Sequence, residues 1–279
     1  MPNGACVVEQ LMRLTPNLLY FGITEKSLAP LVNPQTGSGY SSYSDYSNSL
    51  KGGAVSYCNV NHIKNLPVLP NTLVTLNCPD NQLTNIPELP RSLRNFNCSN
   101  NQLTKLPVLP DSLTTFSCYK NQLAKLPSLP KMIKTLDCTN NRLTSLPTLS
   151  DSLKNLKCAN NNLTSLPDLP KKLKDLDCKN NELTNLPSLP GLLSNLYCNN
   201  NNITHLPGLP SSLHTLNCSD NLIRCFEPFS DTLRITIKNN PFDCLPNYPK
   251  DMDKIAPSCP LCGSDNKNGC PVSKEATTK

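Results

Sequence analysis

A cysteine recurs every twenty residues along most of this chain, and this fixed period constrains the fold more than any other feature. An asparagine follows each of these cysteines by three residues, within the frame LxxLxCxxNxLTxLPxLPxx. A period of this length is typical of a solenoid, in which each unit packs only against its neighbours. The periodic cysteines are Cys58, Cys78, Cys98, Cys118, Cys138, Cys158, Cys178, Cys198 and Cys218.

The residues around each periodic cysteine alternate as in a short β-strand. In one repeat, Leu76 and Cys78 are predicted to point inward, while Thr75 and Asn77 face outward. Equivalent strands stack in parallel at about 4.8 Å, so about nine or ten repeats predict a sheet about 45 Å long. We expect the asparagine amide to bond backbone groups of its own and the neighbouring repeat, which would otherwise be buried without partners.

The segment that leads back to the next strand contains two prolines three residues apart, such as Pro87 and Pro90. Proline fixes φ and lacks a backbone N–H, so this segment is predicted to be an extended, polyproline-type arc rather than a helix. The fold class is therefore a mainly β repeat solenoid with a parallel sheet on one side.

The regularity of the frame divides the chain into four parts. We expect an N-terminal cap over residues 1–36, a Gly-, Ser- and Tyr-rich linker over 37–53, repeats over 54–246 and a cysteine-containing tail over 247–279. The first strand, near Val55, is degraded. The last strand contains Ile235 and Ile237, follows after nineteen residues, and has isoleucine in place of the core cysteine.

Composition limits the cellular compartment and the class of partner that we expect. The net charge of +6 is mild for 279 residues and does not by itself imply a nucleic-acid partner. The periodic cysteines are interpreted as small core hydrophobes, because stacked parallel positions suit neither a disulfide ladder nor a tetrahedral metal site. So many reduced thiols fit the cytoplasm or the cytosol of a host cell. We expect no secretory signal and no membrane-spanning segment.

The repeated motif LPxLPxxLxxLxCxxNxLT, over roughly residues 54–246, resembles the short leucine-rich repeats of bacterial effector proteins and of proteins from amoeba-associated microbes. That resemblance implies a right-handed, curved solenoid with a parallel sheet on its concave face, polyproline arcs on its convex face and small terminal caps. Some members carry a catalytic ubiquitin-ligase domain after the repeats. Residues 247–279 are too few for such a domain, so we expect none here.

Outward-facing positions vary between repeats while the core stays uniform, which indicates a binding surface. Two tyrosines are candidate aromatic anchors in an otherwise polar, charged setting. Stacked lysines repel one another and would favour an acidic partner, although an ordinary solvated face remains an alternative. Arg94 and Arg234 are predicted to extend the lysine column. The candidate partner-binding residues are Tyr119, Asp137, Lys157, Asp177, Tyr197, Lys134, Lys154 and Lys174.

Four cysteines outside the core ladder form a candidate zinc site. Cys225 lies four residues after Asn221 and Cys244 lies four after Asn240, and both asparagines occupy the same position of the repeat frame. The two cysteines are therefore expected to stack in consecutive turns. Cys259 and Cys262, within the sequence CPLCG, resemble the knuckle of zinc-ribbon proteins. Cys270 is a spare ligand, and a Cys225–Cys244 disulfide or free thiols remain alternatives.

Catalysis has little support in the sequence. His62, His205 and His214 lie on separate repeats, with no evident nucleophile beside them. We therefore predict a non-catalytic, monomeric scaffold that binds a protein partner through its concave face, with a host-directed effector as one such role. Two other hypotheses stay open: an adaptor or ubiquitin-ligase-associated component that recruits through a zinc-binding tail, and a nucleic-acid binder that uses the stacked lysines.

Overall fold

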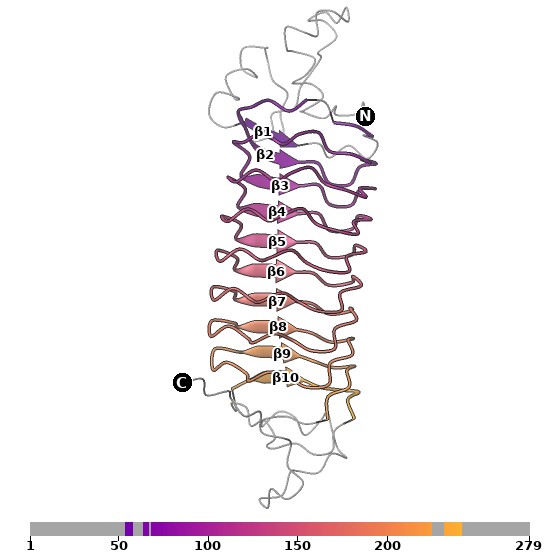
Figure 1. The fold of residues 1–279 in the computed structure, drawn as a ribbon, viewed down its shortest axis with the longest axis vertical. Helices are drawn as coiled ribbons and strands as arrows, with labels where there is room; N and C mark the ends of the chain where they lie inside the picture. The colour runs from indigo at the N-terminus through magenta and orange to yellow at the C-terminus, as the bar shows by residue number, and fades with distance from the viewer. Residues whose placement is uncertain (1–53, 58–63, 67, 225–231, 242–279) are drawn as a thin grey trace, which may run out of the picture.

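The computed structural model describes residues 54–57, 64–66, 68–224 and 232–241, which form one coil with a single parallel sheet (Figure 1). Ten strands follow one another in chain order, each hydrogen-bonded to the next. They are β1 (Ala54–Tyr57), β2 (Leu73–Asn77), β3 (Asn95–Asn97), β4 (Thr115–Ser117), β5 (Thr135–Asp137), β6 (Asn155–Lys157), β7 (Asp175–Asp177), β8 (Asn195–Tyr197), β9 (Thr215–Asn217) and β10 (Arg234–Thr236). The prediction of a mainly β solenoid is confirmed.

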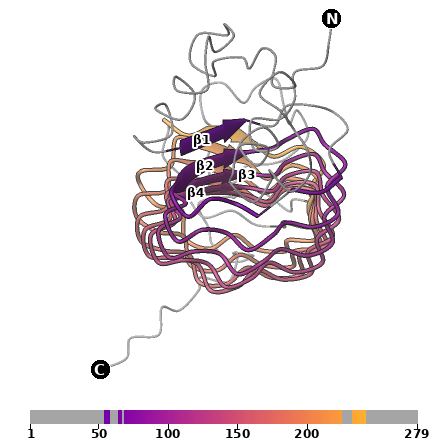
Figure 2. The same cartoon turned by 90° about the horizontal axis from the view of Figure 1, so that it is seen from above.

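The twenty-residue period fixes the register of the sheet. Leu76 of β2 pairs with Phe96 of β3, and Leu136 of β5 pairs with Leu156 of β6. Viewed from above, the strands lie on one side of the coil and the return segments close its other sides (Figure 2). Equivalent residues of successive repeats therefore form columns that run along the stack.

The core consists of columns of leucine and cysteine. Leu76 and Cys78 are fully buried, as the alternation predicts, and Phe96 stacks on Phe116 with ring centroids 5.3 Å apart. Eight of the periodic cysteines, from Cys78 to Cys218, are buried free thiols, and Cys58 lies outside the described residues. The periodic cysteines thus serve as small apolar core residues.

A buried asparagine joins each repeat to its neighbours. The Asn161 amide nitrogen donates to the carbonyl oxygens of Cys138, Cys158 and Ala159, each at 3.1 Å. Its carbonyl oxygen accepts the backbone N–H of Leu143 at 3.0 Å. One side chain thus satisfies groups in two successive repeats that are closed to water. We call this column the asparagine ladder; it comprises Asn81, Asn101, Asn121, Asn141, Asn161, Asn181, Asn201, Asn221 and Asn240.

The residue just before each member of the ladder turns the chain with a left-handed backbone. Its φ lies between 52° and 57° in nine repeats, and Asn or Asp occupies this position in eight of them. These residues tolerate positive φ better than most. The amides also bond along the stack, as from Asn180 to Asn160 and from Asn200 to Asn180, both at 2.6 Å. Lys120 is the exception, with φ 52°.

The return segments contain neither helix nor strand in the part of the chain that the structure describes, as the prolines predict. Serines in the turn before the strand add contacts between repeats: the Ser112 hydroxyl lies 2.6 and 2.7 Å from the carbonyl oxygens of Arg91 and Leu93, which share its one hydrogen. No helix among the described residues is long and apolar enough to cross a membrane.

Both ends of the repeat region follow the sequence-based expectations where they are described. β1 forms at the degraded first repeat, and Ile237 in the last repeat is buried in place of the cysteine. The expected cap over residues 1–36, the linker over 37–53 and the tail over 247–279 lie outside the described residues.

Replacing Lys120 by asparagine is expected to stabilise the protein by about 1 kcal/mol, because lysine is strained at positive φ. The new amide would also lie between Asn100 and Asn140 in the same column. Urea unfolding measures the change. The reverse substitution, Asn140→Lys, should lower the free energy of unfolding by a similar amount, and equal stabilities for Lys120→Asn and wild type would contradict the strain at this position.

Candidate functional site

The outward side chains of the sheet form a continuous surface, which we call the strand face. Its residues come from β2 to β10, from the position immediately before each strand and from the two positions after it. Because the register is fixed, Lys157 lies between Asp137 and Asp177, its partners on the neighbouring strands. We call these three residues the aspartate–lysine column.

The two aspartates of this column are held by their own turns. Asp137 accepts the backbone N–H of Thr139 at 3.1 Å, and Asp177 accepts that of Lys179 at 3.4 Å. The Lys179 ammonium also forms an ion pair with Asp177 at 3.2 Å. The aspartates are half-buried, whereas Lys157 is exposed, so the column presents one free cation between two partly occupied carboxylates.

Lys134, Lys154 and Lys174 stack immediately before β5, β6 and β7, and we call them the lysine ladder. The Lys154 N–H donates to the Lys134 carbonyl, and the Lys174 N–H to the Lys154 carbonyl, both at 2.8 Å. All three side chains are exposed, and within the described residues none forms an ion pair. Like charges on adjacent strands destabilise a sheet by about 0.2–1 kcal/mol a pair.

The predicted extension of the lysine ladder is correct at one end and wrong at the other. Arg94 lies in the same column, because the Thr114 N–H donates to its carbonyl and the Lys134 N–H donates to that of Thr114. Arg234 instead pairs with Thr215, one position further along the strand. The nineteen-residue step is absorbed before β10, which moves Arg234 into the neighbouring column.

The two tyrosines both face outward but do not form one cluster. Tyr119 follows β4 and is half-buried, with the Lys120 ammonium 5.9 Å from its ring centroid. Tyr197 ends β8 and is 37% exposed. Four strand spacings, about 19 Å, separate their repeats. A partner that contacts both must therefore lie along the stack.

A further charged column escaped the sequence-based interpretation because it lies in the turns before the strands. Its members alternate in sign and are all exposed: Arg91, Asp111, Lys131, Asp151 and Lys171. We call it the turn column. Reading every position of the frame at a step of twenty, rather than only the strand positions, would have found it. Opposite charges here neighbour one another, unlike those of the lysine ladder.

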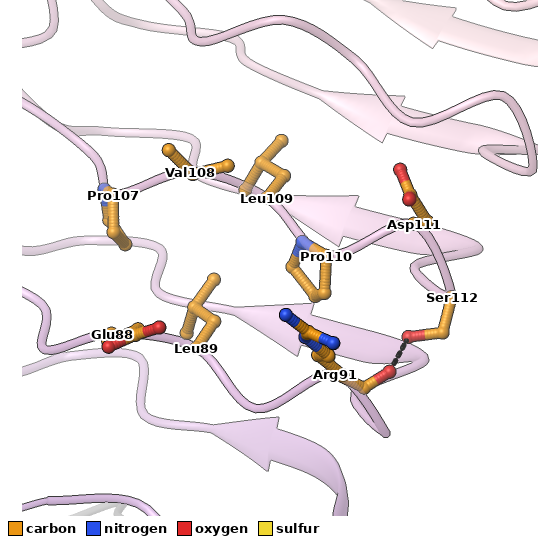
Figure 3. A pocket seen from close by; sticks show the side chains of 9 residues that line it. All are labelled: Glu88, Leu89, Arg91, Pro107, Val108, Leu109, Pro110, Asp111 and Ser112. Atoms are coloured by element: carbon orange, nitrogen blue, oxygen red, sulfur yellow. Dashed lines mark hydrogen bonds between the residues drawn. The ribbon is translucent and has the colours of Figure 1, made fainter.

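A groove of about 770 Å³ opens on the return side of the coil, away from the strand face. Figure 3 shows Glu88 and Arg91 from one repeat facing Val108 and Pro110 from the next. Val108 is 85% exposed. None of the partner-binding residues named from the sequence lines this groove, so it is a separate surface.

The described histidines are not arranged for nucleophilic catalysis. His205 and His214 are exposed, and His62 lies outside the described residues. The Ser194 hydroxyl lies 3.4 Å from His214 Nδ1, but that nitrogen is also 2.6 Å from the Ser212 carbonyl oxygen. A carbonyl accepts only, so Nδ1 carries the hydrogen and cannot take a proton from Ser194.

The core thiols are not candidate nucleophiles either. Burial raises the pKa of every described periodic cysteine, and it raises that of Cys78 from 9.0 to about 12. A protonated, buried thiol neither attacks substrates nor binds metals. Among the described residues, no group of three or more His, Cys, Asp or Glu side chains could hold a metal ion. The predicted zinc ligands Cys225, Cys244, Cys259 and Cys262 lie outside those residues.

The fold and its repeats define the class: the chain is a leucine-rich-repeat protein with the short repeats of bacterial effectors, as the motif predicts. It is similar to YopM from Yersinia enterocolitica, with 33% identity, a TM-score of 0.63, and coverage of 67% of this chain and 46% of that one. YopM from Yersinia pestis, a leucine-rich effector protein, gives 32% identity and a TM-score of 0.60, over 68% of this chain and 61% of that one.

The chain thus spans between about half and three fifths of the length of these two proteins. No protein-family profile matches the sequence, and no curated protein matches it. The likeness rests on the repeat architecture that this chain shares with both Yersinia proteins.

The raised thiol pKa values predict that the protein unfolds in alkali. The unfolded chain loses thiol protons near pH 9, before the folded chain does, so the stability from protonated thiols is complete below pH 9 and lost as the pH rises toward 12. Each thiol should lower the free energy of unfolding by about 1.4 kcal/mol per pH unit in this range. Urea titrations at several pH values measure the slope. A Cys138→Val, Cys158→Val variant should show a slope that is smaller by the contribution of two thiols. An unchanged slope would contradict the assignment of these thiols as buried and protonated.

Proposed function

We propose that the chain is a non-catalytic scaffold that binds a protein partner through its strand face. The observation that carries this proposal is a chemically varied, exposed surface built on a repeated backbone. Tyr197, Lys157 and the lysine ladder are exposed, while Leu156 and Leu196 beneath them are fully buried. Residues of this kind change the surface without changing the fold, which is how one architecture serves different partners.

The composition of the strand face supports a protein as the partner. Tyrosine is one of the residue types that dominate interfaces between proteins. Clustered charge adds specificity and speeds association with a partner of opposite charge. The surface runs over several repeats, so a partner can make contacts along the stack rather than at one pocket. The similar structure from Yersinia pestis is that of a leucine-rich effector protein, and the buried free thiols of this chain fit a reducing compartment. We therefore place the proposed function in a cytoplasm or in the cytosol of a host cell.

Affinity capture with two matched variants tests the proposal. Tyr119→Ala with Tyr197→Ala removes both aromatic side chains from the strand face, and we expect partner capture to fall at least fivefold. Thermal unfolding should be nearly unchanged because both side chains face away from the core. Val68→Ser with Val108→Ser removes two exposed apolar side chains from the return side and should leave capture intact. Loss of capture in the valine variant alone would move the interface to the groove of Figure 3.

A further inference from the structure

The lysine ladder differs from the charged columns on either side of it. The turn column alternates in sign from Arg91 to Lys171, and the aspartate–lysine column alternates through Asp137, Lys157 and Asp177. In both, each charge has opposite neighbours on the adjacent repeats. The ladder alone stacks three like charges at the strand spacing, about 4.8 Å.

The fold does not require lysine at this position. Thr114 precedes β4 and Ser194 precedes β8 in the same column, with the same backbone hydrogen bonds to the neighbouring repeats. Neutral, shorter side chains thus satisfy the structure, whereas three lysines add repulsion. An acidic ligand would remove that repulsion, which indicates that the ladder is a binding feature.

The spacing of the ladder matches a helix better than an extended chain. Two strand spacings place Lys134 and Lys174 about 9.6 Å apart along the stack. Two turns of an α-helix advance about 10.8 Å, a mismatch that a lysine side chain easily absorbs. In an extended chain, three residues on one face lie at i, i+2 and i+4, and the first and third are about 13 Å apart.

The width of the strand face also fits one helix. Lys154 lies immediately before β6 and Lys157 ends it, so the two residues are three apart, about 10 Å if the backbone between them is extended. An α-helix with its side chains is about 10–12 Å across. A helix that lies along the stack between these two positions can therefore place carboxylates over the ladder on one flank and contact Lys157 on the other.

Neighbouring carboxylates argue against a nucleic acid on this surface. Asp175 lies one residue beyond Lys174 and accepts a hydrogen bond from Asn195 at 2.5 Å, so its charge stays beside the ladder. Asp137 and Asp177 lie three residues beyond Lys134 and Lys174, on the same side of the ladder as Asp175. A phosphate backbone would meet these carboxylates, and no aromatic side chain stands in the ladder to stack a base. A helix can confine its negative charges to one face.

We propose that the partner presents an α-helix with one acidic residue per turn over three turns, and that this helix binds along Lys134, Lys154 and Lys174. The proposal rests on the function proposed above and names the chemistry of its partner. Helical spacing of the acidic residues, not total negative charge, is the feature that the ladder recognises.

Two synthetic helical peptides of the same composition test this. One carries glutamates at i, i+4 and i+7, and the other carries three glutamates on separate faces. Fluorescence anisotropy at low salt should show at least tenfold tighter binding of the first peptide to the wild-type protein. Lys134→Thr, Lys154→Thr, Lys174→Thr should abolish that preference and should unfold at no lower temperature than wild type, because threonine already stands at position 114.

The matched control is Lys64→Thr, Lys105→Thr, Lys125→Thr, which removes the same charge from exposed positions outside the strand face. It should keep the tenfold preference. Equal binding of both peptides, or an intact preference in the ladder variant, would overturn the proposal. Tighter and steeply salt-dependent binding of oligouridylate would overturn it in favour of a polyanion. None of these outcomes bears on the tyrosine test of protein capture, so the two proposals fail separately.

Discussion

The buried asparagine ladder is the interaction on which the rest of this structure depends. Each coil leaves backbone groups inside the stack that neither a neighbouring strand nor water can satisfy. Asn161 meets them in two repeats at once: three carbonyl oxygens share the two hydrogens of its amide, and its own oxygen accepts one bond. Aspartate has no hydrogens to donate, and glutamine places its amide one carbon further from the backbone. The repeat therefore needs asparagine here, and the coil in turn keeps this side chain away from water.

Because the ladder and the leucine–cysteine core fix the backbone, the outward positions are free to differ. The strand face and the turns carry tyrosines, alternating charges and one column of like charges on a nearly constant scaffold. Under the proposed function, partner recognition depends on which columns carry which side chains. The lysine ladder is the place where electrostatics works against the fold, and this is the physical reason to read it as functional.

The sequence predicts the coil, the register and the buried cysteine column well, because a step of twenty places equivalent residues in contact. Side-chain bonding within a repeat is harder to predict. The Asp177 carboxylate accepts the backbone N–H of Lys179 and forms an ion pair with the Lys179 ammonium. Less of its negative charge is therefore available to a partner than the sequence column suggests. The position of Arg234 was wrong because a nineteen-residue step does not show where the missing residue is absorbed. The positive φ before each ladder asparagine could have been predicted from the Asn or Asp that recurs at that position. The alternation pattern that predicts strands does not consider this position.

Chemical unfolding of two adjacent alanine variants tests the central claim most directly. Asn161→Ala removes four buried hydrogen bonds, and Asn162→Ala removes an exposed amide whose side-chain bond is to Glu182. The account predicts that Asn161→Ala lowers the free energy of unfolding by about 3 kcal/mol, while Asn162→Ala changes it by less than about 0.5 kcal/mol. Equal, small losses in both variants would contradict the claim that the asparagine ladder holds the repeats together.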